Sequence, residues 1–532
     1  MKNINKLFSC VVTLGLFVTS CSDLEQFNGN DKNISQEQLE VDFQHVGSKY
    51  KPIFESIYQY DPAWSYQLQQ NLNADVYSGY LTNPRPFVAG ANNTTYSLVT
   101  GWNDVIWSVP YSNVMNNVKS ISDLTKTDFP TLNGVAMILK VAAMHRVTDV
   151  FGPIVYSNFG DLTNAGVYDS QQDAYNAFFT DLDIAVTNLT TDIDSQKFTA
   201  FDLSYDGNYT QWVKLANSLR LRLAIRISKV DPAKSKTEGE KALSQSLGLM
   251  VANEDGFFVN GSLDHPLSVI DNSWGDIRMN ASMESILTGY NDTRKDAFFL
   301  EKNPTDSETI PVVSGELKGV RAGLPLLSGY SDELTQKADY INFAVINDNI
   351  HTPKVQLMTT AEVAFLKAEA ALRGWAGAGS AQANYEAGVT ASFTQHGVSD
   401  ASGYLADNTS TPADFVDALF SVNDIAYASD VKIAYNAAGT NEEQLEQIIT
   451  QKWIALFPNG WEAYAEARRT GYPRQLPRVQ SDNPDVPVDQ IPARLIYTSS
   501  EYTNNAEAVQ AAVSSSELGS DKNNVKLWWD KK

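Results

Sequence analysis

The sequence predicts an all-α protein, and three observations carry this prediction. A helical period of apolar residues dominates the chain beyond residue 35. Two segments begin with capping boxes, Thr359 with Glu362 and Thr440 with Glu443, in which the threonine oxygen accepts from an amide and the glutamate reaches back. Turns join successive helices into pairs, similar to a tetratricopeptide-like scaffold but without a fixed sequence repeat of about 34 residues.

The N-terminal segment predicts a secretory signal peptide over residues 1–20. Residues 1–6 are basic, and residues 7–18 form an apolar stretch of 12 that is too short to span a bilayer. The segment closes with Val18-Thr19-Ser20-Cys21, which resembles a bacterial lipobox. We therefore expect Cys21 to be lipidated and to become the first mature residue, while Cys10 leaves with the leader.

Residues 21–34 predict a flexible tether rich in Gly, Asn and Asp. Its start, Ser22-Asp23-Leu24-Glu25, also resembles an acidic export signal that sends lipoproteins of some Gram-negative bacteria to the outer face of the outer membrane. An ordinary solvated linker is the alternative. Because no later stretch is apolar enough to span a membrane, attachment is expected to depend on the lipid.

Beyond the tether we predict one helical domain over residues 35–532. Its length alone would suggest two to four domains, but the composition shows no break that would separate them. The period is clear between Tyr209 and Val230, where Asp231-Pro232 is expected to end the helix. Helices are predicted over residues 35–60, 64–80, 102–124, 132–150, 171–189, 209–230, 359–374, 381–393, 440–456 and 461–469, with irregular segments over 256–334, 394–439 and 474–497.

Two polar sets lie within these helices. Arg220, Arg222 and Arg226 are interpreted as a solvated or carboxylate-paired face. Residues 145–149 are interpreted as helix surface followed by a C-terminal turn.

The charge excludes one class of partner. Lys and Arg number 40 against 63 Asp and Glu, a net charge of −23, and removal of Lys2 and Lys6 with the leader takes it to −25. Nucleic-acid binding needs clustered cations that release counterions, so nucleic acid is not expected as a partner.

The chain carries no recognisable cofactor or metal motif. The five histidines are scattered without metal-ligand spacing, and neither Gly-x-Ser-x-Gly nor a phosphate-binding glycine loop occurs. Residues 202–207 have the oxygen spacing of a calcium loop, but Val213 stands where a bidentate glutamate is needed, which favours a helix-entry turn. No cofactor is expected. Carboxylate pairs for glycoside hydrolysis stay open, because the distance that matters is spatial.

Aromatic residues outside the helix interiors favour a sugar site. Tyr77, Tyr80, Phe87, Trp274 and Tyr290 alternate with Asn, Asp and Arg. Aromatic faces stack on sugar rings, and amides and carboxylates bond hydroxyl groups. The alternative for each ring is ordinary packing in the core or in a loop.

Several segments, in order along nearly the whole chain, resemble the SusD/RagB family of outer-membrane lipoproteins. They are the lipobox at Cys21 and residues 149–156, 212–222, 360–370, 451–456, 461–473, 494–497, 501 and 527–530. The resemblance implies a SusD-like all-α fold, with tetratricopeptide-like helix pairs and long loop insertions. It also implies a non-catalytic, lipid-anchored protein of the outer membrane that faces the cell exterior.

In such a family the protein binds a nutrient glycan and passes it to a SusC-like TonB-dependent transporter barrel. From the resemblance and the aromatic pattern we predict ligand contacts at Asp75, Tyr80, Trp274 and Arg278. The Trp-rich loop of starch-binding relatives is not recognisable over residues 81–100, so starch is not expected. The alternatives are a peptide-binding uptake lipoprotein of the RagB type, a secreted glycoside hydrolase and a helical adaptor that binds only protein.

Overall fold

The computed structural model describes residues 41–57, 62–84, 93–164, 166–261, 264–302, 317–324 and 340–532. Cys21, Phe87 and the tether lie outside these ranges. The chain divides into two compact units, Met1–Ser48 and Lys49–Lys532. The described part of the first unit holds η1 (Val41–Phe43) and α4 (Gln44–Gly47). The helices and strands from residue 49 onward form the second unit.

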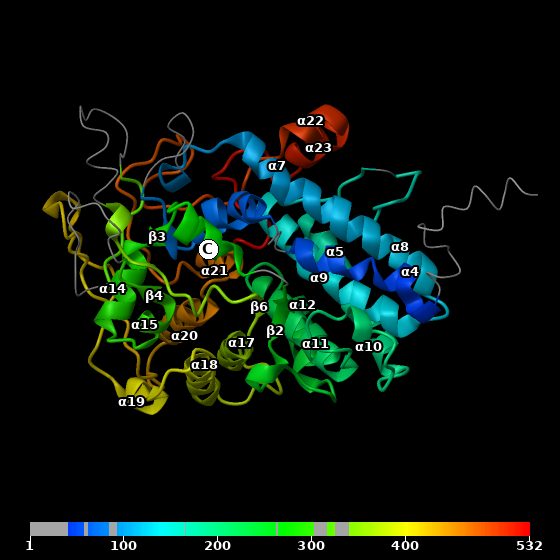
Figure 1. Ribbon diagram of the computed structural model, residues 1–532, viewed down its shortest axis with the longest axis horizontal. Coiled ribbons are helices and arrows are strands. Elements are labelled where there is room, and N and C mark those ends of the chain that lie inside the picture. Colours follow the sequence, from blue (N-terminus) through cyan, green and yellow to red (C-terminus); the bar gives the residue numbers. More distant parts are fainter. Residues whose placement is uncertain are drawn as a thin grey trace, which may run out of the picture. The chain divides into compact units, whose positions relative to one another are not determined.

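Its first half is a set of packed helices around a long central pair. α9 (Pro130–Phe151) packs along α10 (Gln171–Thr190), and α10 in turn contacts α11 (Tyr209–Arg226) (Figure 1). The other elements here are α5 (Tyr50–Ile57), α6 (Ala63–Tyr66), η2 (Gln67–Asp75), η4 (Asn93–Thr95), α7 (Thr100–Val109), η5 (Pro110–Met115), α8 (Asn116–Thr125), η6 (Thr199–Phe201) and α12 (Pro232–Ser244).

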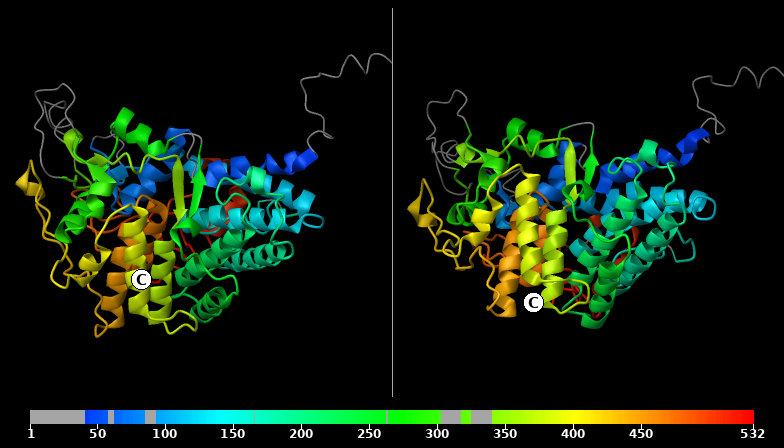
Figure 2. Two further views of the ribbon diagram at one scale, coloured as in Figure 1. Left: turned by 60° about the horizontal axis from the view of Figure 1, so that its bottom comes forward. Right: turned by 90° about the horizontal axis from the view of Figure 1, so that it is seen from below.

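The last third adds a second group of helices. α17 (Thr360–Leu372) packs against α18 (Ala381–Gln395) and α20 (Asn441–Leu456), and Figure 2 shows the three lying side by side. α21 (Gly460–Thr470) follows α20 directly and packs on η2. The remaining elements are α19 (Ala401–Ala406), η10 (Ser421–Asn423), α22 (Ser499–Asn504) and α23 (Ala506–Val513).

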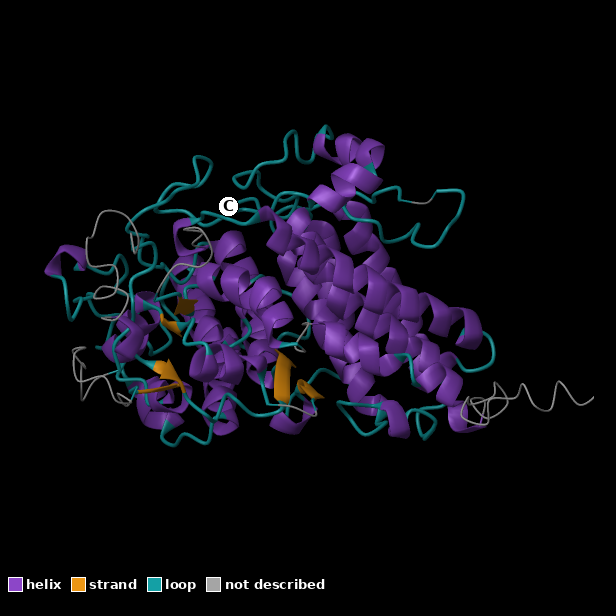
Figure 3. Cartoon of the chain, turned by 45° about the horizontal axis from the view of Figure 1, so that its top comes forward, coloured by secondary structure: helices purple, strands orange, loops and turns teal. Residues whose placement is uncertain are grey.

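Strands are few in the described part of the chain, and each pairs with one other strand. Figure 3 shows them as short pieces among helices. The antiparallel pairs are β1 (Leu81–Thr82) with β3 (Arg278–Met279), β2 (Phe257–Asn260) with β6 (Lys354–Met358), and β4 (Phe299–Leu300) with β5 (Val345–Ile346). Between them lie η7 (Asn253–Asp255), α13 (Pro266–Ser268), η8 (Val269–Ser273), α14 (Ala281–Gly289), α15 (Arg294–Phe298) and η9 (Tyr340–Asn342). The predicted all-α class is confirmed.

Both predicted helix starts are confirmed, but the Glu362 side chain does not make its predicted capping contact. Thr440 and Glu443 form the complete capping box. Thr359 accepts from the amide of Glu362 at 3.2 Å, but the Glu362 carboxylate binds Arg222 at 2.6 and 2.7 Å instead of returning to the cap. A buried guanidinium is a stronger partner for that carboxylate than one amide.

Other boundaries were wrong for reasons of local chemistry. Asp231-Pro232 begins a helix as well as following one, because the Asp231 side chain caps α12 by accepting from Lys234 N at 3.0 Å. The segment predicted as irregular over residues 256–334 contains α13, η8, α14 and α15, which are too short for a clear period.

A buried ionic cluster joins α11, α17, α20 and α21. Arg226 binds Glu462 at 2.7 Å and Glu466 at 3.2 Å, and Arg469 binds Glu369 and Glu466, each at 2.6 Å. Burial alone would raise the pKa of Glu369, but Arg469 and Arg373 hold it at about 2. The carboxylate-paired interpretation of the α11 arginines is therefore confirmed, and the solvated one is wrong because the surrounding helices cover that face.

The prediction for residues 145–149 was also wrong. His145, Arg146 and Asp149 are buried, since α9 is covered on nearly every side by neighbouring helices. No helix in the described ranges has the length and apolar character needed to cross a bilayer.

Candidate functional site

The four predicted ligand contacts come from segments that the fold brings together. The β1–β3 pairing sets Thr82 opposite Arg278, and Asn280 N donates to the carbonyl of Tyr80 at 3.0 Å. η2, which ends at Asp75, leads directly into this pair. Residues about 200 positions apart thus lie in one region of the molecule.

Three of the four are buried, and their polar atoms bond within the protein. The Asp75 carboxylate accepts from Gln70 Nε2 and Asn71 Nδ2, each at 3.3 Å. The Tyr80 hydroxyl donates to the carbonyl of Trp453. Arg278 forms an ion pair with Asp271 at 3.1 Å and donates through Nε to the carbonyl of Ile341 at 2.8 Å.

Burial governs the titration of these groups. It raises the pKa of Asp75 to about 7, against the opposing effect of Asn71 and Gln70. It also raises the pKa of Asp271, although Arg278 pulls in the other direction. Both carboxyl groups are enclosed, and their polar contacts are made within the protein.

Of the four predicted ligand contacts, Trp274 is the one that keeps some exposed surface, since it is half-buried. It ends η8, and its amide donates to the carbonyl of Val269 at 3.0 Å. Gly275 follows with a φ of 66°, a left-handed conformation that favours glycine and turns the chain towards β3. With this turn, Trp274 is left partly exposed.

Polar groups that the sequence did not single out surround this turn. Asp276 Oδ2 accepts from Gln67 Nε2 at 3.0 Å, and its carbonyl accepts from Asn83 Nδ2 at 2.8 Å. Trp64, 54% exposed, lies on α6, which packs against η8. We call Trp64, Gln67, Asn83, Trp274 and Asp276 the Trp274 face.

The sequence held only a weak signal for the additional members of this face. Trp64 and Gln67 fall inside a predicted helix, where exposure depends on what covers each side. Asn83 and Asp276 come together because β1 pairs with β3. Strands of two residues are too short to leave a recognisable pattern in the sequence. Trp64 is exposed and Trp274 and Asp276 are partly exposed, whereas Gln67 and Asn83 are buried and hold Asp276 in place. The exposed chemistry of the face is therefore two aromatic rings beside a carboxylate, which suits a binding surface.

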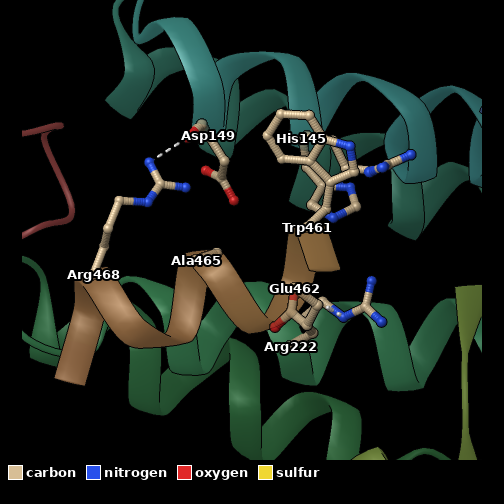
Figure 4. Close-up of a pocket in the computed structure, with 8 residues that line it drawn as sticks. His145, Asp149, Arg222, Trp461, Glu462, Ala465 and Arg468 are labelled. Atoms are coloured by element: carbon tan, nitrogen blue, oxygen red, sulfur yellow. Dashed lines mark hydrogen bonds and ion pairs between the residues drawn. The ribbon is translucent and has the colours of Figure 1, made fainter. Parts of the chain in front are cut away.

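A second concentration of charged side chains lies in the core between α9, α11 and α21 (Figure 4). It surrounds a cavity of about 10 Å³, room for about one water molecule. The lining residues are His145, Arg146, Asp149, Arg222, Trp461, Glu462, Ala465 and Arg468.

The acidic groups of this core cluster are already engaged. Asp149 Oδ1 accepts from the Tyr175 hydroxyl and from Trp529 Nε1, both at 2.7 Å. Burial, and then the charge of Arg222, hold the pKa of His145 well below its usual range, so the imidazole is neutral. The cluster joins helices and has no room for a substrate.

The helix-entry turn over residues 202–207 uses its carboxylate internally. Asp202 accepts from the amides of Ser204 and Gly207 at 2.8 and 2.9 Å, and from Trp212 Nε1 at 2.8 Å. Within the ranges that the structure describes, no group of His, Cys, Asp and Glu side chains could hold a metal ion.

Comparison with known proteins gives one family. The model for "SusD-like: Susd and RagB outer membrane lipoprotein" matches residues 26–530. No protein with a curated description matches the chain significantly.

Solved structures agree with this family. The chain is similar to a chitin-binding SusD homologue from Flavobacterium johnsoniae, with 43% identity, a TM-score of 0.86, and 91% of this chain and 98% of that chain covered. It is also similar to SusD homologues from Bacteroides uniformis (35% identity, TM-score 0.80, 92% and 99% covered) and Bacteroides vulgatus (33%, 0.83, 92% and 99%).

Proposed function

The chain belongs to the SusD-like family of outer-membrane lipoproteins, and from this we propose that it binds nutrient oligosaccharides at the cell surface and passes them, unaltered, to a SusC-like TonB-dependent transporter. The ligand class that fits best is a chitin oligosaccharide. The observation that carries the proposal is the Trp274 face, whose two indoles and partly exposed Asp276 carboxylate suit a sugar.

The relative from Flavobacterium johnsoniae supports chitin among the glycans. It binds chitin by its description and is 43% identical over 91% of this chain. An N-acetylglucosamine unit offers a pyranose C–H face for an indole, together with hydroxyl and amide groups that can donate to the Asp276 carboxylate, which the buried Gln67 positions.

Isothermal titration of the purified chain tests the ligand class. We expect binding of N-acetylglucosamine oligomers and no saturation by malto-oligosaccharides or peptides. Saturation by peptides alone would replace this proposal with the RagB-type alternative. Release of reducing ends from chitin by the pure protein would favour the hydrolase alternative.

Membrane attachment is proposed to depend on Cys21. A Cys21→Ala chain is expected to lose fatty-acid labelling and to leave the membrane fraction while keeping ligand binding, because the acyl chains are the only anchor proposed. Cys10→Ala is the matched control, since that thiol lies in the predicted leader. Continued fractionation of the Cys21 variant with membranes would contradict the anchor.

The transporter is proposed as a binding partner at the outer membrane. Affinity purification of the lipidated chain from its own membranes is expected to recover a TonB-dependent barrel in near-equal amount. Recovery of the chain without any barrel would contradict the delivery role and leave the binding role intact.

A further inference from the structure

A second cavity, outside the Trp274 face, lies against the β2–β6 pair. Its volume is about 580 Å³, within the range of about 300–1,000 Å³ that is typical of small-molecule sites. In Figures 1 and 2 the two strands lie beside the α17–α18 helices. The cavity is also lined by the C-terminal end of α18, the start of α13 and the segment before β6.

Strand alternation separates the cavity face of this pair from its core face. Phe257 and Val259 of β2 are buried, and so are Val355 and Leu357 of β6. The residues between them point to the opposite face. There the register pairs Phe258 with Gln356 and Asn260 with Lys354, and all four line the cavity.

The lining is rich in amide side chains, and hydrogen bonds hold two of them in place. Gln395 Nε2 donates to Gln356 Oε1 at 2.7 Å, and Gln356 Nε2 donates to the carbonyl of Leu456 at 3.0 Å. Amides present both a donor and an acceptor, which suits hydroxyl groups. The amide residues of the lining are Asn253, Asn260, Asn349, Gln356 and Gln395.

The ring of His265 lines this cavity and is held in one tautomer. The residue is 98% buried, with a relative exposure of 2%. Its Nδ1 accepts from Leu267 N at 3.2 Å, so the proton of the neutral ring is on Nε2. Burial, and then His351, lower the pKa of His265 to about 3, which keeps the ring neutral.

Two lining atoms are buried without a hydrogen-bond partner in the described ranges. Ser204 Oγ and His396 Nε2 are buried, and neither bonds to another described residue. Burial, and then Arg294, lower the pKa of His396 to about 4, so this ring is neutral as well. Buried polar atoms without partners are uncommon in proteins and favour a ligand or water that supplies them.

Charge and shape narrow the ligand class. Among the described residues of the lining, the charged side chains are Glu254 and Lys354, which are of opposite sign and exposed. Phe258 is partly exposed, lines the cavity and has no ring partner among the described residues. A partly exposed ring, neutral imidazoles and amides match an uncharged sugar better than an ion or a charged peptide.

We propose that this cavity is a second binding site for a neutral oligosaccharide, in which Phe258 stacks on a sugar ring and His265, Gln356 and Asn260 bond hydroxyl or amide groups. The α13–η8 segment runs from His265 at this cavity to Trp274 at the other face. The choice of sugar rests on the proposed function, whereas the existence of the cavity site does not depend on the Trp274 face.

Calorimetry with a short probe tests the second site. Triacetylchitotriose is titrated into the full chain and into the variants Phe258→Ala, Asn260→Trp and Trp274→Ala. Asn260→Trp fills the cavity from an exposed position and removes no core side chain. Val422→Ala, 86% exposed on η10, is the matched control, and circular dichroism confirms that each variant is folded.

We expect two molecules bound per chain. Each cavity variant should abolish one site or weaken it by about ten-fold or more, while Trp274→Ala should affect only the other site. One molecule per chain, with Phe258→Ala and Asn260→Trp silent, would overturn the second site and leave the proposed function standing. A single bound molecule whose affinity falls in all three variants would mean that one extended site includes both regions. That result would overturn the proposal of two separate sites. No binding of any sugar would overturn both proposals.

Discussion

The rings of Tyr80 and Trp453 lie 4.9 Å apart although 373 positions separate them in the chain. The Tyr80 hydroxyl donates to the carbonyl of Trp453, and Trp453 Nε1 donates to the carbonyl of Ser78 at 2.8 Å. The carbonyl of Trp453 belongs to the last turn of α20, where helix carbonyls lack a partner within the helix. The tyrosine therefore completes a helix end in the core.

Removal of this hydroxyl should cost stability. Tyr80→Phe leaves a buried carbonyl unsatisfied, so we expect the free energy of unfolding to fall by about 1–3 kcal/mol. Urea denaturation measures the loss. Tyr502→Phe is the matched control, since Tyr502 is 41% exposed and water can replace its bond to Asp521. If Tyr80→Phe keeps full stability but loses sugar binding, Tyr80 is a ligand contact instead.

Gly460 is required by the close approach of α21 to Asp75. A Cβ atom at Gly460 would lie 2.1 Å from Asp75 Oδ1 and 2.8 Å from its backbone nitrogen. Gly460→Ala is expected to destabilise the protein by about 1–3 kcal/mol, as measured by thermal and urea unfolding.

The chain offers a control of the same chemistry. Gly101 lies in α7, and a Cβ there would meet nothing within 4 Å. Gly101→Ala should be stabilising by about 0.5–1 kcal/mol because alanine loses less conformational entropy in a helix. Equal effects of the two substitutions would contradict the close contact at Asp75.

Asp75 predicts a pH dependence of stability with a definite sign. Its pKa is raised from 3.8 in the unfolded chain to about 7 in the folded protein. Between these values the folded state holds a proton that the unfolded state has released, so this group lowers stability as pH rises. The loss is complete above the folded pKa and is at most about 4 kcal/mol.

Asp75→Asn should remove this contribution. Asn71 Oδ1 has no partner among the described residues, so rotation of the Asn71 amide lets it accept from the new amide group. We expect the variant to gain stability over the parent at about pH 8 and to gain little at about pH 5, in urea titrations at each pH. A difference that is independent of pH would show that Asp75 ionises normally.

Trp274 should contribute to sugar binding through stacking. Trp274→Ala is expected to weaken chitin-oligosaccharide binding by about 1–3 kcal/mol, a rise in Kd of about 5- to 150-fold. Calorimetry measures the change. Tyr502→Ala provides an exposed aromatic residue on α22 as the control. Unchanged affinity in Trp274→Ala would show that the indole does not contact the sugar and only packs against the protein.

Local pattern in the sequence determined most of the helices. Some helix features depend only on residues within one or two turns, so they can be predicted without knowledge of the fold. They are the period over residues 209–230, the cap at Thr440 and the predicted breaks at Pro458 and Gly471. The order of family segments likewise determined the SusD-like fold, which the family model and the solved structures confirm.

Only the tertiary structure decided which polar and aromatic residues reach the surface. Asp75, Tyr80 and Arg278 resemble ligand contacts in sequence, yet pairing of β1 with β3 and packing of η2 on α21 enclose them. The same packing leaves Trp274 half-exposed and sets Phe258 at the edge of a cavity. Exposure is a property of what lies opposite a residue, and residues hundreds of positions away supply that neighbour.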